Sequence, residues 1–90
     1  MDSKILSIII PIFNEVKTIE LVLERIEEVQ LDGVGYEVIL VDDGSTDGTR
    51  ELLAKLREKH KVILLDRNYG KGAAVKRGIL ASSGDLTGTW

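Results

Sequence analysis

The chain has 90 residues, a formal net charge of −3 at pH 7 and no cysteine. This length allows at most one small domain, and the negative charge argues against nucleic acid as a general partner. Disulfides and thiolate chemistry are excluded, and the single histidine, His60, makes a histidine-based metal site implausible. The sequence shows no secretory signal and no apolar run near the ~18 residues that span a bilayer. We therefore expect a cytoplasmic protein, membrane-associated only through a longer parent.

The N-terminal third is predicted to form a strand, a loop and a helix. Residues 5–10 are apolar and mostly β-branched, which is typical of a buried strand, and the only proline, Pro11, ends it. Residues 11–15 then form a loop. A helix is expected over about residues 17–29, because apolar side chains recur there at helical spacing while the glutamates lie off that stripe. Two glycines within residues 31–35 indicate a turn.

The rest of the chain continues the alternation of strands and helices. Strands are predicted at about residues 37–41 and 61–65, and helices at about residues 48–59 and 73–81. Residues 85–86 look like the start of a fourth strand. Alternating strands and helices imply a parallel sheet with right-handed crossovers. The predicted fold class is therefore α/β, with three parallel strands, alternating helices and the stub of a fourth strand.

The second predicted strand ends abruptly in two adjacent carboxylates, Asp42 and Asp43. Two like charges side by side raise each other's cost, so a buried strand rarely ends in such a pair by accident. The carboxyl ends of parallel strands are also where ligands bind in open α/β sheets. We therefore predict that Asp42 and Asp43 lie at the mouth of a binding site.

Three loops leave the carboxyl ends of the three strands and should cluster at one edge of the sheet. The candidate site residues that these loops supply are Pro11, Phe13, Glu15, Asp42, Asp43, Lys71 and Gly72. Carboxylates can accept hydrogen bonds from the N–H groups of a base or the hydroxyls of a ribose. A glycine-rich turn before a helix offers backbone N–H donors, and Lys71 adds a positive charge. Carboxylates on one side and phosphate-type donors on the other describe a nucleotide site.

These residues also have purely structural interpretations. Asp43 could order its turn through side-chain to backbone hydrogen bonds, and Asp47 could cap the helix that follows. Ser45 and Thr46 fit the same turn. Glu15 alone would be a solvated charge that favours the first turn of a helix.

Two familiar phosphate-binding motifs are absent. The Walker pattern needs Ser or Thr after its lysine, whereas Gly72 follows Lys71. The dinucleotide fingerprint needs glycines after the first strand, and the first loop of this chain has none.

Four stretches of the sequence resemble the N-terminal half of a family-2 glycosyltransferase. They are IIIPIFNE (residues 8–15), VDDGSTDGT (41–49), NYGKGAA (68–74) and ASSGD (81–85). Each stretch is short, but their order and compatible spacing make the resemblance specific. It covers nearly the whole chain up to Leu86, and the polyprenyl-phosphate (dolichol-phosphate type) sugar transferases look most similar.

The resemblance implies a partial Rossmann-like (GT-A) three-layer fold and an inverting enzyme that transfers a sugar from a UDP- or GDP-sugar to an acceptor. On the family pattern, the residues that border the base and ribose are Pro11, Phe13 and Glu15. Asp43, or its neighbour Asp42, contacts the uracil or guanine ring. The residues near the pyrophosphate are Lys71 and Gly72. A divalent metal, Mn or Mg, is implied for the full-length family.

The sequence departs from the family pattern after Asp85. In the family, an apolar strand follows and ends in an Asp-x-Asp metal motif, and the catalytic base lies in a later acceptor half; residues 86–90 do not resemble that strand. We expect residues 1–86 to form the nucleotide-binding half of a glycosyltransferase catalytic domain, with residues 87–90 as a non-matching tail. By this interpretation the chain is a truncated fragment, inactive alone, that carries no catalytic and no metal-ligating residue. A full-length parent would use a membrane or polyprenyl-phosphate acceptor.

Truncation would also expose one edge of the first strand, because the family's strand order is 3-2-1 and then 4. An unpaired apolar edge recruits another strand. We expect either self-association of the chain or pairing of the C-terminal stub onto that edge.

Two other classes of function remain open from the residues. A receiver-like signalling module also has an acid pair at a strand end, but there the pair follows the first strand; only Asp66, after the third strand, favours this alternative. A non-catalytic assembly module is the other alternative, and nothing in the sequence names its partner.

Overall fold

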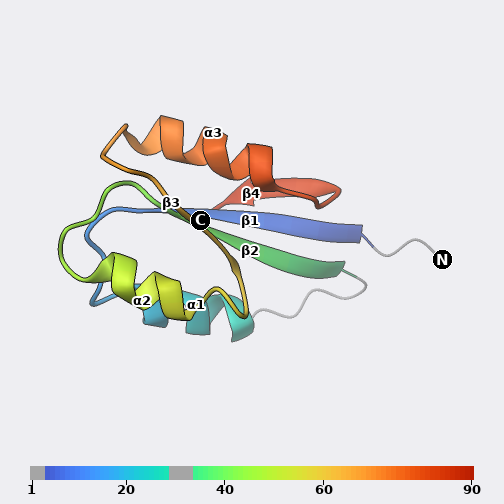
Figure 1. Ribbon diagram of the computed structural model, residues 1–90. Helices are drawn as coiled ribbons and strands as arrows, with labels where there is room; N and C mark the ends of the chain where they lie inside the picture. Colours follow the sequence, from blue (N-terminus) through green and yellow to red (C-terminus); the bar gives the residue numbers. More distant parts are fainter. Residues whose placement is uncertain (1–3, 29–33) are drawn as a thin grey trace.

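The computed structural model describes residues 4–28 and 34–90, and it confirms the predicted α/β class. The strands are β1 (Lys4–Ile12), β2 (Val34–Asp42), β3 (Lys61–Leu64) and β4 (Leu86–Thr89), and the helices are α1 (Ile19–Glu28), α2 (Thr49–Lys55) and α3 (Lys71–Ala81). All strand pairs are parallel, in the order β3-β2-β1-β4. Helix α3 covers one face of the sheet, and α1 and α2 lie on the other (Figure 1).

Alternation along the strands divides the core into two clusters, one on each face of the sheet. The cluster beneath α1 and α2 comprises Ile10, Ile12, Ile19, Leu23, Ile26, Val38, Leu40 and Leu53. The cluster beneath α3 comprises Ile9, Ile39, Val41, Leu65 and Ala74. Helix α3 lies so close to β1 that a Cβ atom on Gly78 would stand 2.5 Å from Cγ2 of Ile9. The central strands β1 and β2 therefore bury residues on both faces of the sheet, whereas the edge strand β4 is mostly exposed.

Strand register brings the carboxyl ends of the central strands together. The pairing of β1 with β2 runs without a shift from Lys4 opposite Val34 to Ile12 opposite Asp42. Backbone hydrogen bonds continue past the strand ends, from Asp43 N to the carbonyl of Ile12 (2.8 Å) and from Leu65 N to the carbonyl of Asp42 (2.9 Å). The three loops that follow β1, β2 and β3 consequently gather at one end of the molecule (Figure 1).

Several element boundaries differ from the predicted ones for local reasons. β2 begins at Val34, because β1 offers a pairing partner well before the apolar run starts. α2 ends at Lys55, where Leu56 N bonds to the carbonyl of Leu53 and tightens the last turn. α3 begins at Lys71, directly after Gly70 in a non-helical conformation (φ 102°). The predicted helix end at Val29 and most of the predicted 31–35 turn lie outside the described residues.

The C-terminal stub pairs onto the free edge of β1, which is the second of the two expected outcomes for that edge. β4 pairs in parallel with β1 from Leu6 opposite Leu86 to Ile9 opposite Thr89, so the strand continues into residues 87–89 of the expected tail. Trp90 N extends the ladder by bonding to the carbonyl of Ile9 at 2.9 Å. Self-association stays a prediction. Among the described residues, no helix has the length and apolar character needed to cross a membrane.

A polar network centred on Glu37 joins the strands at the end away from the three loops. The hydroxyl of buried Ser7 and both the amide and the hydroxyl of Ser83 donate to the Glu37 carboxylate, and Lys61 pairs with it at 2.9 Å. Gly84 N donates in turn to the Ser7 hydroxyl at 2.9 Å. The hydrogen bond from Ser7, supported by those from Ser83 and Lys61, lowers the pKa of Glu37 to about 2 although burial opposes the shift.

We predict that Glu37→Gln destabilises the fold at pH 7 by about 1–3 kcal/mol, because hydrogen bonds to a charged group are lost. The pKa of Glu37 falls from 4.5 to about 2 on folding, so its contribution is present above pH 4.5 and disappears as the pH falls towards 2. Urea denaturation between pH 7 and pH 2 should therefore show a flatter profile for the variant than for the wild type. Glu51→Gln, on the exposed side of α2, is the control. Identical pH profiles for Glu37→Gln and the wild type would contradict this account.

Candidate functional site

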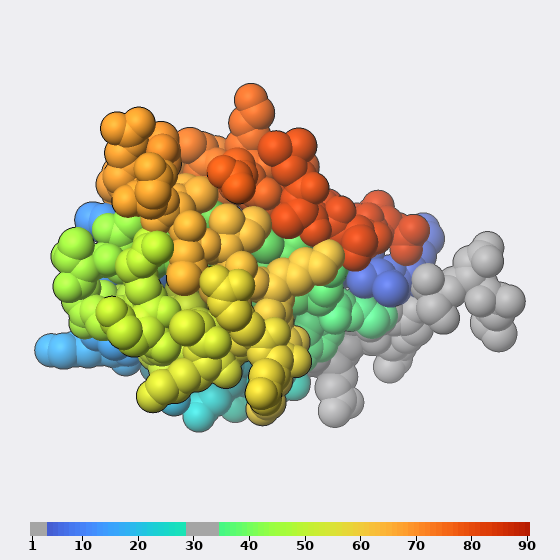
Figure 2. Space-filling view, viewed as in Figure 1, coloured from blue at the N-terminus to red at the C-terminus, as the bar shows by residue number. Residues whose placement is uncertain are grey.

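A cavity of about 430 Å³ opens at the carboxyl ends of the strands. Its lining residues are Pro11, Ile12, Phe13, Glu15, Asp43, Asn68, Gly70, Lys71 and Trp90. Pro11 and Ile12 are the last two residues of β1, which continues past its predicted end at Pro11, and Lys71 is the first residue of α3. The other lining residues come from the three loops and from the residue that follows β4. Figure 2 shows this end of the molecule, where the orange residues that follow β3 lie above the yellow-green residues that follow β2.

Asp43 joins two of these loops through its side chain. The residue is 2 % exposed, and its two carboxylate oxygens accept hydrogen bonds from the backbone amides of Tyr69 (2.7 Å) and Gly70 (3.0 Å). The loop after β3 also presses directly on Gly44, since a Cβ atom there would stand 2.5 Å from the backbone carbon of Arg67. Gly44 has a φ of 79°, which a residue without a Cβ atom adopts at no steric cost.

Asp42 is fully buried and points away from the cavity into a different set of contacts. Its Oδ2 accepts hydrogen bonds from Ser45 N (3.0 Å) and from Nη1 of Arg50 (2.8 Å). The same Arg50 nitrogen donates to the carbonyl of Leu65 at 2.6 Å. Arg50 therefore ties the end of β2 to α2 and to the end of β3. The other carboxylate oxygen, Oδ1, is buried without a hydrogen-bond partner among the described residues.

The loop after β1 is held by side chains of the turn after β2. Asn14, the one non-glycine residue with positive φ (53°) in the described part of the chain, exchanges two hydrogen bonds with that turn. Its backbone amide donates to the Ser45 hydroxyl, and its side-chain oxygen accepts a hydrogen bond from Thr46 N, each at 2.8 Å. Short polar side chains of this kind commonly satisfy the backbone in such turns.

Glu15 is placed by the same turn. Its amide donates to the Thr49 hydroxyl at 3.1 Å, and Val16 N donates to Asp47 at 3.2 Å. Asp47 also accepts from both the amide and the hydroxyl of Thr49, and the hydroxyl contact is the main reason that the pKa of Asp47 is lowered. Asp47 therefore satisfies the first amide of α2, although Gly48 occupies the cap position.

The structure brings five of the seven predicted site residues into one cavity, namely Pro11, Phe13, Glu15, Asp43 and Lys71. Asp42 and Gly72 are not part of its lining. The contacts of Ser45, Thr46 and Asp47 follow their structural interpretations. Sequence reasoning gave no role to Arg50 or Trp90. Parallel pairing of β4 with β1 brings Trp90 to the mouth of the cavity. The sequence of residues 85–90 alone does not reveal which residues of β1 they pair with, so Trp90 could not be placed.

Charges around the cavity are divided between its walls. Glu15 and Asp43 lie on the side of the first two loops, and Lys71 lies on the side of the third. Next to that wall, Arg67 stacks 5.0 Å from the ring centre of Tyr69, whose hydroxyl donates to Asp66 at 2.7 Å. That hydrogen bond is the main reason that the pKa of Asp66 is lowered. The cavity thus offers acceptors on one side and a cation on the other.

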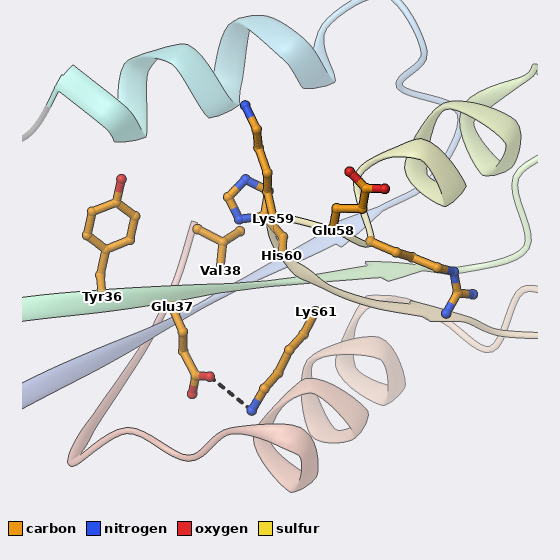
Figure 3. Close-up of a pocket in the computed structure, with 8 residues that line it drawn as sticks. Tyr36, Glu37, Val38, Glu58, Lys59, His60 and Lys61 are labelled. Atoms are coloured by element: carbon orange, nitrogen blue, oxygen red, sulfur yellow. Dashed lines mark ion pairs between the residues drawn. The ribbon is translucent and has the colours of Figure 1, made fainter.

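A second cavity, of about 530 Å³, lies at the start of β3, away from the three loops. Figure 3 shows its lining, in which Glu37 points to Lys61 and away from His60. His60 is half-buried, and burial is the main reason that its pKa is lowered. Because the Glu37 carboxylate is engaged by Ser7, Ser83 and Lys61, this cavity offers mainly exposed charges at its rim.

In the stretches 4–28 and 34–90, no three or more His, Asp or Glu side chains come together as a metal-binding group. The residues described here therefore do not fit a divalent ion by themselves.

Comparison with known sequences identifies the family. A sequence model of the glycosyl transferase family 2 matches residues 7–90. The chain belongs to this family. The undecaprenyl-phosphate 4-deoxy-4-formamido-L-arabinose transferase of Aeromonas hydrophila is 43% identical over 91 residues. That match covers 94% of this chain and 28% of the relative, so the chain spans little more than a quarter of the length of this curated family member.

Solved structures show the same fold in other members. S. aureus TarS (residues 1–349), in complex with UDP, matches with a TM-score of 0.81 and 30% identity over 94% of this chain and 26% of its own. The mannosyltransferase PcManGT from Pyrobaculum calidifontis, in complex with GDP-Man and Mn²⁺, matches with a TM-score of 0.71 and 28% identity over 91% of this chain and 25% of its own. These likenesses confirm the GT-A-like, partial Rossmann fold that the sequence resemblance implied.

We predict that Arg50→Met destabilises the protein by about 3 kcal/mol, because it leaves the fully buried Asp42 carboxylate without its counter-charge. Thermal or urea denaturation measures the loss. Arg57→Met, which removes an exposed arginine beyond α2, is the control and should cost little. Adding Asp42→Asn to Arg50→Met should restore part of the stability. Equal stability of Arg50→Met and Arg57→Met would contradict a structural role for the pair.

We predict that Gly44→Ala destabilises the protein by more than 1 kcal/mol, because the new Cβ atom would meet backbone atoms of Arg67 and Asn68 at 2.5 Å in a strained conformation. Gly72→Ala is the matched control. No atom lies within 4 Å of a Cβ atom there and the site is helical, so that change should be neutral or stabilising by about 0.5–1 kcal/mol. Equal melting temperatures for the two variants would contradict the close seating of the loop on Gly44.

Proposed function

We propose that this chain provides the nucleotide-binding part of a family 2 glycosyltransferase and binds the UDP or GDP portion of a nucleotide-diphospho-sugar. The observation that carries the proposal is the cavity that joins Phe13, Glu15 and Asp43 to Lys71. An aromatic wall suits a flat base, carboxylates suit its N–H groups and the ribose hydroxyls, and a lysine suits a phosphate. TarS bound to UDP and PcManGT bound to GDP-Man support this assignment and leave both bases open.

Each wall receives a role in this proposal. Pro11 and Phe13 border the base, Glu15 faces the ribose, and Asp43 faces the base. The diphosphate lies on the Lys71 side, where the amides that open α3 precede its first intrahelical hydrogen bond, from Ala74 N to the carbonyl of Gly70. Gly72 contributes through its backbone there. Asp42 is left out of the ligand contacts because it is buried against Arg50.

For the whole protein we propose transfer of the sugar with inversion to a polyprenyl phosphate. The support is the similarity to a transferase whose name specifies undecaprenyl phosphate, together with the family resemblance. PcManGT was solved with Mn²⁺, and a divalent metal fits the family. We assign no metal ligand within the described residues, where no such cluster occurs.

Calorimetric titration of the chain with UDP and with GDP tests the proposal. We predict millimolar or tighter binding of one of them. Lys71→Met should bind it about ten- to a hundredfold more weakly, because a charge-assisted hydrogen bond to phosphate contributes about 1.5–3 kcal/mol. Binding of neither nucleotide at millimolar concentration would refute the proposal.

Lys76→Met is the matched control for this titration. Lys76 is an exposed lysine of the same helix, α3, but is not among the lining residues of the cavity. The two variants remove the same charge, so a general electrostatic effect would weaken binding equally in both. A loss confined to Lys71→Met supports direct contact with the phosphate.

A further inference from the structure

The Asp43 carboxylate is already engaged before any ligand arrives. Its two oxygens accept from the amides of Tyr69 and Gly70 at 2.7 and 3.0 Å, and its own amide donates to the carbonyl of Ile12. The side chain is almost completely buried, so these hydrogen bonds are shielded from water. Asp43 is therefore a junction between the three loops as well as a face of the cavity.

The two amides that Asp43 holds belong to the wall that carries the cation of the cavity. We call residues Asn68–Lys71 the third-loop wall; three of them, Asn68, Gly70 and Lys71, line the cavity. The wall lies against Gly44, whose Cβ position is 2.5 Å from the amide nitrogen of Asn68. The close packing against Gly44 and the two hydrogen bonds to Asp43 therefore both fix the third-loop wall.

We propose that Asp43 is a positioning residue for the diphosphate part of the site: by holding the amides of Tyr69 and Gly70, it sets the third-loop wall and hence Lys71 where the phosphates bind. This inference rests on the proposed function and adds a second role for Asp43, since facing a base alone would leave the phosphate side untouched. Preorganisation of this kind raises affinity because the loop need not be ordered when the ligand binds.

For Asp43→Asn, the change in charge and the loss of positioning should shift the affinity for phosphate in opposite directions. Replacing Asp43 with Asn removes a negative charge beside an anion site, which by itself should tighten the binding of a phosphate. The same substitution replaces one accepting oxygen with an NH₂ group, which cannot accept from the amide of Tyr69 or Gly70. If the hydrogen bonds position the wall, the affinity for phosphate falls despite the favourable change in charge.

The test is titration of the chain with inorganic pyrophosphate, which has no base, for the wild type and for Asp43→Asn. We expect about a tenfold or greater loss of pyrophosphate affinity in Asp43→Asn. The matched control is Asp66→Asn, which neutralises an exposed carboxylate of the same loop whose partner is the Tyr69 hydroxyl. Asp66→Asn should bind pyrophosphate as well as the wild type, or slightly better.

The outcomes separate this inference from the proposed function. Unchanged or tighter pyrophosphate binding by a folded Asp43→Asn overturns the positioning role and leaves nucleotide binding intact. A wild-type chain that binds UDP or GDP but ignores millimolar pyrophosphate also overturns it. A wild-type chain that binds no nucleotide at all refutes the proposed function itself.

Amide exchange of the wild type provides a second measurement if Asp43→Asn fails to fold. The ligand-free chain should protect the amides of Tyr69 and Gly70 from exchange, although Tyr69 is an exposed residue, and pyrophosphate should shift the amide resonances of the wall. Rapid exchange of both amides, or resonances that do not respond to pyrophosphate, would overturn the inference without any variant.

Discussion

Two adjacent buried carboxylates at the end of β2 are the constraint on which the rest of the site depends. A buried carboxylate is costly unless it is paired or hydrogen-bonded, so each member of the pair needs its own partners. Asp42 takes Arg50 from α2, and Asp43 takes two amides from the loop after β3. The two side chains point in different directions. Asp42 therefore joins the end of β2 to α2, and Asp43 joins it to the loop after β3 that forms one wall of the cavity. The partners that stabilise the two buried charges thereby also fix the arrangement of the loops.

Two hydroxyl side chains, one in the turn after β2 and one at the start of α2, hold the loop after β1. The Ser45 hydroxyl accepts a hydrogen bond from the backbone amide of Asn14, and the Thr49 hydroxyl accepts one from the backbone amide of Glu15. The segment after β1 therefore follows the shape of the segment after β2. The cavity is consequently built from loops that contact one another through side-chain to backbone hydrogen bonds. A site built in this way is largely preorganised and needs little rearrangement when a ligand binds.

The strands and the place of the cavity at their carboxyl ends could be predicted from the sequence, because both follow from local sequence patterns. The apolar run Val38–Val41 predicts a buried strand, and the acids that follow it mark a loop at the carboxyl edge. The role of Arg50 could not be predicted, because its distance from Asp42 depends on how α2 packs back on the sheet. The early start of β2 at Val34 depends on pairing with β1, which no local pattern of β2 contains. The division of labour between the two acids depends on side-chain direction at the strand end.

Engagement of Asp43 also removes two backbone amides, those of Tyr69 and Gly70, from the donors that a ligand could use. The amide of Gly70 donates to the Asp43 carboxylate and stabilises its charge, so it is not available to a phosphate. Compensation of the carboxylate by two amides reduces the repulsion that a nearby diphosphate would feel. In the proposed nucleotide complex, the Lys71 ammonium and the amides that open α3, all beyond Gly70 in the chain, stay available to the phosphates. Under the proposed function, a carboxylate and a diphosphate share one small cavity because the loop between them carries donors for both.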